Sequence, residues 1–269
     1  MTPGPAAGPP AAGGLDPNEW AAVYETPRPN GHQLVFRAGA EIARRACLAF
    51  ASPGERWLDV GCGTGHLAAA LSAAGLRVTG VDSDSRMIAA ARARFPGLSF
   101  ETAHASFLPS PDDSVDGVVA TSVLGCLEDP AGFVAEAARV LRLAGTVVLT
   151  FTNRSSPLHA VGNCLALLEK RRSPTYAAAR LFSTTEAIEL LSQAGFAMER
   201  LRYYNCFLGT ARGSFPPRRF VSALEPFVNV HPLVGSLLGR NLLAVASKRQ
   251  APSAAGSVTG AWQAKRSQT

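Results

Sequence analysis

The sequence predicts an α/β fold, in which helices cover both faces of a largely parallel β-sheet. The first observation behind this prediction is that short β-rich stretches alternate with helical stretches of roughly ten to fourteen residues. The second is a glycine-rich segment at 61–65, which directly follows the first apolar stretch and opens the first helical one. Ligands of such sheets bind beyond the carboxyl ends of the strands, which is where this segment falls.

The individual elements follow in regular order along the chain. Strands are expected at 56–60, 77–82, 98–103, 116–122 and 146–151, and helices at 66–75, 85–95 and 129–142. Gly75 is typical of a helix end, and Asp84 is a suitable N-cap for the second helix. Asp129 followed by Pro130 is a start signal for the third helix. Each expected element therefore has a local reason to begin or end where it does.

The two ends of the chain are expected to be disordered tails. Residues 1–18 are mainly Pro, Ala and Gly, and residues 250–269 are small and polar apart from Trp262. Such segments bury too little apolar surface to offset their ordering entropy. A single folded domain is therefore predicted over residues 19–249.

Composition narrows the class of protein. Of the 269 residues, 47% are hydrophobic and 17% are charged, and no apolar run approaches the twenty or so residues of a membrane span. The amino terminus lacks the basic start and uninterrupted apolar stretch of a secretory signal, so a cytoplasmic location is the default expectation. The five cysteines form no C-x-x-C pair, and no carboxylate and amide cluster is evident, so no metal is expected.

Charge is uneven along the chain. Residues 200–249 hold eight Lys and Arg residues against Glu225 alone, within a net charge of +6. A dedicated nucleic-acid binder would show clustered bases with interleaved aromatic residues, and neither is present. We therefore expect no nucleic-acid partner.

The stretch "WLDVGCGTG" at 57–65 carries the strongest functional signal. A dinucleotide fold uses G-x-G-x-x-G, whereas the spacing here is G-x-G-x-G, and Asp59 before the first glycine would repel a phosphate. This argues against a nicotinamide oxidoreductase. Asp59 is suited to a positively charged group of the ligand, and Asp82, at the end of the second strand, is suited to a ribose diol. A ligand that carries both groups and no phosphate is S-adenosylmethionine.

With these residues the sequence resembles the class I S-adenosylmethionine-dependent methyltransferases, in the small-molecule group whose first motif reads like "LDVGCGTG". Further segments that match the family in order and spacing lie at 108–130, 139–151, 182–201 and 241–248. The resemblance implies a Rossmann-like, seven-stranded, mostly parallel sheet with an antiparallel last strand and helices on both faces.

The resemblance also implies a set of cofactor-binding residues. Asp59 would orient the methionyl part, Asp82 would bind the ribose hydroxyls, and Thr121 and Ser122 would lie near the sulfonium. The remaining members are Gly61, Cys62, Gly63 and Gly65 along the methionyl part, and Ser83, Met87, His104, Ala105 and Ser106 around the adenine. His104 replaces the acid that the family often has there, and Cys126 stands where relatives frequently place histidine.

Methyl transfer is an in-line displacement, so alignment and water exclusion supply much of the acceleration and a base is needed only for a protonated acceptor. The candidate catalytic residues are His159, which follows the fifth strand, and Tyr24 as a positioning group. His32, His231 and Tyr204 are further candidates. The alternative is a non-catalytic protein that binds the cofactor, or a partner, on the same fold.

The acceptor must be recognised by segments outside the shared core. These are a helical cap at 19–50 and two substrate segments at 152–181 and 205–240. The first substrate segment predicts either a hydrophobic lid or ordinary packing. The basic and apolar stretch at 215–240 is compatible with a peripheral contact with an anionic membrane and a lipid-like acceptor, of quinone, tetrapyrrole or secondary-metabolite type, or with core packing. The acceptor, the methylated atom and the oligomeric state stay open.

Overall fold

The computed structural model describes residues 16–159, 161, 180–210, 213–215, 220, 227–229 and 231–249. The first helix, α1 (Pro17–Glu25), begins two residues before the predicted boundary of the domain. Asp16 caps it, because its carboxylate accepts hydrogen bonds from the backbone of Asn18 at 2.7 Å and of Glu19 at 3.4 Å. Residues 1–15 and 250–269 lie outside the described part of the chain.

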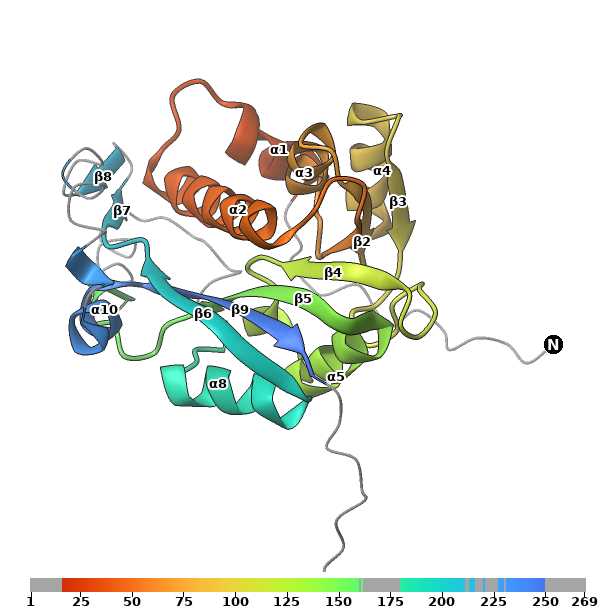
Figure 1. The fold of residues 1–269 in the computed structure, drawn as a ribbon. Coiled ribbons are helices and arrows are strands. Elements are labelled where there is room, and N and C mark those ends of the chain that lie inside the picture. The colour runs from red at the N-terminus through yellow and green to blue at the C-terminus, as the bar shows by residue number, and fades with distance from the viewer. Residues whose placement is uncertain are drawn as a thin grey trace, which may run out of the picture.

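The centre of the molecule is a seven-stranded sheet (Figure 1). Its strands are β1 (Arg56–Val60), β2 (Arg77–Asp82), β3 (Ser99–Thr102), β4 (Val115–Ala120), β5 (Leu141–Thr152), β6 (Phe196–Tyr204) and β9 (Asn241–Lys248). Their order is β3-β2-β1-β4-β5-β9-β6, and β9 runs antiparallel to both of its neighbours. The predicted mostly parallel sheet with an antiparallel last strand is therefore confirmed.

Helices cover both faces of this sheet (Figure 1). On one face lie α2 (Gly31–Phe50), α3 (His66–Ala73) and α4 (Ser85–Arg94), and on the other α5 (Pro130–Val140) and α8 (Thr184–Gln193). The buried cluster on the α2 face includes Trp57, Val148 and Leu243, and the opposite cluster includes Phe133 and Leu149. Helix α1 packs on α2 and α4, so the predicted cap lies over one face of the sheet.

One boundary in the middle of the chain differs from the prediction. The helix expected at 129–142 ends at Val140, and β5 begins at Leu141 rather than at residue 146. Leu141 pairs with Val115, and residues 142–145 then bulge before the pairing resumes between Gly117 and Thr146. Ala144 adopts a left-handed conformation within this bulge, with φ of 61°. In the sequence, the apolar spacing of the helix continues as far as Leu141. Only pairing with β4 decides where the backbone becomes extended.

The segments predicted to recognise the acceptor are partly described. A two-stranded ribbon of β7 (Leu208–Thr210) and β8 (Gly213–Phe215) packs against α2, and the short helix α10 (Pro232–Leu238) packs against β6. Most of 152–181 and much of 211–230 lie outside the described residues. In the part of the chain that is described, no helix combines the length and apolar character that crossing a bilayer requires.

Candidate functional site

The glycine-rich loop begins where β1 ends. The backbone N–H groups of Gly61 and Cys62 donate to the carbonyl oxygen of Val81 on β2, at 2.7 and 3.0 Å, so the loop folds back over the neighbouring strand. Gly61, Gly63 and Gly65 all have positive φ angles, of 70°, 53° and 83°. Glycine adopts this conformation without steric cost, which explains the alternate glycines of the motif.

The cap contacts the loop directly. A Cβ atom on Gly63 would lie 2.3 Å from the indole Nε1 of Trp20 on α1, and one on Gly65 would lie 2.6 Å from the ring of Phe100. Trp20 thus covers the loop, a contact that the sequence did not predict. The only available signal was that Trp20 lies in the segment expected to form the cap.

Asp82 lies at the end of β2 and holds the loop in place. Its Oδ2 accepts a hydrogen bond from the N–H of Gly63 at 2.9 Å, and its Oδ1 accepts one from the N–H of Asp84 at 2.9 Å. Burial raises the pKa of this carboxyl, while the backbone donors oppose the rise. A carboxylate has about four acceptor positions, so beside these backbone donors Asp82 can also accept a hydrogen bond from a ligand diol.

Asp59 is more deeply buried, with 1% of its surface exposed. Burial raises its pKa to about 7, the N–H of Ala68 opposes this, and the like charge of Asp82 adds to it. Within the described residues, its Oδ2 has no hydrogen-bond partner. A buried carboxylate with an unpaired oxygen is costly unless a cation or a donor approaches it.

The residues predicted around the adenine follow β2 and β3. Ser83 is exposed, and Met87 is buried on α4. Beyond β3, Ala105 is buried and Ser106 is half-buried, while His104 is exposed. The Nδ1 of His104 accepts a hydrogen bond from the N–H of Ser106 at 3.3 Å, so this ring closes a local turn. The contact of each residue with adenine stays a prediction.

Thr121 and Ser122 directly follow β4, which ends at Ala120 rather than at residue 122 as predicted. Ser122 is in the left-handed region, with φ of 59°, and its N–H donates to the Oγ1 of Thr150 on β5 at 2.8 Å. The hydroxyl of Tyr204 on β6 also bonds the Thr150 side chain. These polar groups join the ends of three strands beside the glycine loop.

Tyr24 of α1 lies beside the loop as well. Its ring stacks on that of His66 with centroids 4.7 Å apart, and His66 Nδ1 lies 3.1 Å from the hydroxyl of Thr64. Burial and the charge of Asp59 raise the pKa of Tyr24. Glu25 then fastens the end of α1, because its carboxylate accepts from Arg94 at 3.0 Å. Tyr24 is therefore brought near Asp59.

The hydrogen bond of His159 is made to the carboxyl-terminal part of the chain and not to the glycine loop. Its Nε2 lies 2.7 Å from the carbonyl oxygen of Arg240, on the connection between α10 and β9, and burial lowers its pKa. The neighbouring Asn153 and Ser156 also donate to the carbonyl oxygens of residues 236 and 237, at the end of α10, and of residue 239, which follows it. His231, at the start of α10, is exposed, and the side chain of His32 lies outside what is described. A catalytic role for His159 stays a prediction.

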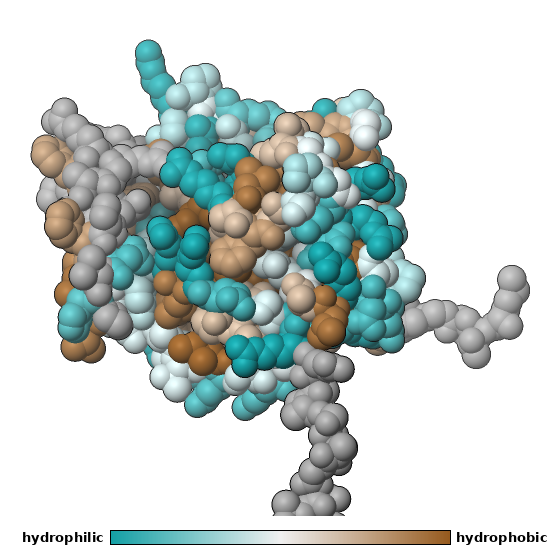
Figure 2. Space-filling view, viewed as in Figure 1, coloured by the Kyte–Doolittle hydropathy of each residue, from teal (hydrophilic) through white to brown (hydrophobic). Residues whose placement is uncertain are grey.

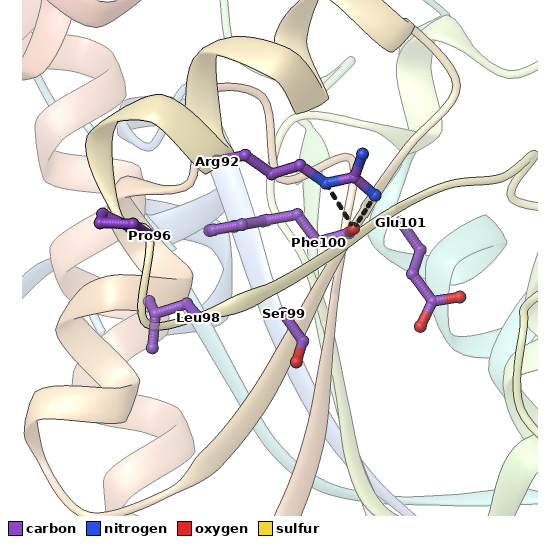
Figure 3. Close-up of a pocket in the computed structure, with 6 residues that line it drawn as sticks. All are labelled: Arg92, Pro96, Leu98, Ser99, Phe100 and Glu101. Atoms are coloured by element: carbon purple, nitrogen blue, oxygen red, sulfur yellow. Dashed lines mark hydrogen bonds between the residues drawn. The ribbon is translucent and has the colours of Figure 1, made fainter.

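Two depressions on the described surface lie outside the glycine loop itself. One follows the edge strand β3, where the guanidinium of Arg92 donates to the carbonyl oxygen of Phe100 at 3.2 and 2.6 Å (Figure 3). The other lies between the start of α5 and α8. The glycine loop lines neither of them. Among the described residues, no group of three or more His, Cys, Asp or Glu side chains could hold a metal ion.

The residues of the loop fit an organic cofactor with a cationic group and a diol. Asp59 offers a buried, unpartnered oxygen, Asp82 offers two fixed oxygens, and the positive φ angles of the glycines let the backbone turn closely beside these two acids. These features are the ones that S-adenosylmethionine would use.

Comparison with known proteins agrees with this geometry. Residues 58–149 match a family model described as a methyltransferase domain. A probable S-adenosylmethionine-dependent methyltransferase of Mycolicibacterium smegmatis is 35% identical over 164 residues, which are 61% of this chain and 60% of that protein. This chain therefore spans less than two thirds of that relative. A phosphatidylethanolamine N-methyltransferase of Cereibacter sphaeroides is 35% identical over 147 residues, 51% of this chain and 72% of the relative.

A solved structure shows the same fold. It is a magnesium protoporphyrin IX methyltransferase from Synechocystis, determined with bound SAH, and it superposes with a TM-score of 0.60 at 18% identity. The superposition covers 86% of this chain and 93% of that one.

Proposed function

We propose that this chain, which belongs to the class I S-adenosylmethionine-dependent methyltransferases, transfers the cofactor's methyl group to a small-molecule acceptor. The observation that carries the proposal is the glycine loop, with one oxygen of the buried Asp59 unpartnered beneath it and Asp82 hydrogen-bonded to it.

Each part of the site has a role in this proposal. When bound, the cofactor supplies an electrophilic methyl group on a sulfonium. Asp82 orients the ribose, and Asp59 balances the charge of the methionyl ammonium. Trp20, packed on Gly63, keeps water from the loop, and the bond from Ser122 to Thr150 fixes the end of β4 near the reacting atoms. Alignment and water exclusion are the contributions that an in-line displacement needs.

Transfer of labelled methyl groups tests the proposal. Purified protein is incubated with S-adenosylmethionine labelled in its methyl group and with the small-molecule extract of its source cells, and we expect label in an organic product. Heat-treated protein is the control. Binding of the cofactor without any labelled product would favour the alternative, a non-catalytic cofactor-binding protein.

The acceptor class is a finer proposal. We infer an apolar or lipid-like acceptor, of quinone, tetrapyrrole or secondary-metabolite type, because apolar side chains of the second substrate segment, 205–240, lie exposed. Leu233 and Leu237 of α10 are 68% and 52% exposed, and Phe227 is 70% exposed. Figure 2 shows apolar side chains at the left edge of the molecule, where Figure 1 places α10. The lipid named for the Cereibacter relative is of the same general kind.

This apolar surface also supports a peripheral membrane contact, aided by the basic character of residues 200–249. We expect the protein to co-sediment several-fold more with vesicles containing phosphatidylglycerol than with pure phosphatidylcholine vesicles. The double variant Leu233→Ser/Leu237→Ser should lose this binding. Ile188→Ser, on α8 and outside the substrate segments, exchanges another exposed apolar residue and should retain it. Equal sedimentation with both vesicle types would rule out the membrane contact.

A further inference from the structure

A row of polar side chains lies on the α2 face of the sheet, along its carboxyl edge. Side chains alternate between the two faces of a strand. Asp59 therefore shares the face of Trp57, and Thr150 shares that of Val148, both of which belong to the buried cluster under α2. Tyr204 belongs to the same cluster. Polar groups on this face of the sheet therefore point toward the cap helix α2, and not toward the apolar cluster under α5 and α8.

Contacts connect this row from β4 to β6. The N–H of Ser122 donates to Thr150, and the Thr150 side chain bonds the Tyr204 hydroxyl. Tyr204 pairs with Asn241 at the start of β9. Asn205 follows Tyr204 directly, so it forms the end of a polar row that begins beside the glycine loop.

Among the described residues of this row, the hydrogen bonding of Asn205, like that of Asp59 at the other end, is incomplete. It is only 1% exposed, and it holds a left-handed conformation with φ of 59°. Its Nδ2 donates to the carbonyl oxygen of Val35 on α2 at 3.2 Å and to the Oδ1 of Asn241 at 3.0 Å. No described residue donates to its Oδ1.

The orientation of this amide follows from its partners. The Val35 carbonyl can only accept a hydrogen bond, so the NH₂ side of the amide must face α2. Rotating the amide by half a turn would place two acceptor oxygens against each other. The Oδ1 is therefore the free end, and leaving a buried acceptor without a donor is unfavourable.

We propose that Asn205 Oδ1 accepts a hydrogen bond from a hydroxyl or amine of the methyl acceptor, and that the site thereby selects acceptors carrying such a donor. This inference rests on the proposed methyl transfer and deepens it. An oxygen buried between the cap and the sheet discriminates strongly, because an acceptor without a donor would leave it unpaired.

Asn205→Gly tests the inference, because glycine keeps the positive φ while removing the amide. The probe is the whole small-molecule extract of the source cells at a series of dilutions, with labelled S-adenosylmethionine at saturation. Initial rates against dilution give an apparent KM for the acceptor without its identification. We expect Asn205→Gly to raise this apparent KM by about tenfold, equivalent to about 1.4 kcal/mol.

The matched control is Asn241→Ala. It removes one partner of the Asn205 NH₂ group but leaves the bond to Val35 and the free Oδ1, so the apparent KM should change by less than about threefold. Titration calorimetry with the demethylated cofactor product should give the same dissociation constant for both variants and the wild type. If Asn205→Gly binds the demethylated product more weakly than the wild type, Asn205→Ser is used in its place. The serine side chain is shorter, so its oxygen no longer reaches the position of Asn205 Oδ1.

The outcomes separate this inference from the function on which it rests. An unchanged apparent KM in Asn205→Gly, or an equal rise in Asn241→Ala, would overturn the role of Asn205 while methyl transfer stands; an internal water on Oδ1 would give this result. Absence of labelled product with the wild type would overturn the proposed function, and the inference with it.

Discussion

Replacing Asp82 with alanine is expected to weaken the binding of S-adenosylmethionine and of its demethylated product by at least about a hundredfold. The variant removes the two oxygens proposed to hold the ribose diol, and charge-assisted hydrogen bonds contribute roughly 1.5–3 kcal/mol each. It also frees the N–H of Gly63, which Asp82 now holds at 2.9 Å, so the loop loses its anchor. Titration calorimetry measures the effect.

Asp84→Ala is the matched control for this experiment. Asp84 lies two residues away and caps α4, where its carboxylate accepts from the N–H of Arg86 at 2.9 Å. Its removal should cost about 1 kcal/mol of stability and leave cofactor affinity within about threefold. Unchanged affinity in Asp82→Ala, or equal losses in both variants, would remove Asp82 from the proposed site.

Asp59→Asn is expected to stabilise the ligand-free protein at pH 8 while weakening its binding of the cofactor. Burial raises the pKa of Asp59 from 3.8 to about 7, so the folded state holds its proton more tightly than the unfolded state does. A shift of this size corresponds to about 4 kcal/mol. Ionised Asp59 is thus a source of instability that an uncharged amide of the same shape removes.

The direction of this pKa shift determines how the stability of the protein changes with pH. Because the folded state binds the extra proton between about pH 4 and pH 7, the free energy of unfolding of the wild type should fall as pH rises through this range. Asp59→Asn should show a smaller fall, because burial also raises the pKa of Asp82. It should exceed the wild type at pH 8 by about 1–3 kcal/mol, less than the full shift because its amide leaves one polar atom unpaired. Denaturant unfolding followed by tryptophan fluorescence measures both curves.

The control for this variant is Asp112→Asn, which exchanges an acid whose side chain is 74% exposed. It should keep the fall between pH 4 and pH 7. Cofactor binding should weaken only in Asp59→Asn, because the proposed partner of Asp59 is a cation. A lower stability of Asp59→Asn than of the wild type at pH 8 would contradict the unfavourable burial of this charge.

Much of the fold could be predicted from the sequence because its signals are local. Asp129 and Pro130 mark the start of α5, and the apolar stretches at 56–60 and 77–82 coincide with β1 and β2. The bulge at 142–145 was missed, because it depends on how Leu141 pairs with Val115. Helix boundaries within a continuous periodic pattern are set by such partners rather than by propensity.

For the candidate site, the motif predicted the loop and its two acids but not what surrounds them. Trp20 on Gly63 and the free Oδ1 of Asn205 depend on contacts between elements far apart in the sequence. His159 was predicted from its position after β5, and its bond to the carbonyl oxygen of Arg240 is a further contact that the sequence could not show. Its catalytic role stays a prediction.

The sequence by itself determined the alternation of strands and helices and the place of the glycine loop between Asp59 and Asp82, because these follow from residue type and short spacings. Only the tertiary structure decided that Asp59 is buried with an unpaired oxygen, that α1 covers the loop, and that Asn205 ends a polar row beneath α2. Burial and hydrogen-bond completion are properties of packing between distant segments, so no local pattern reports them.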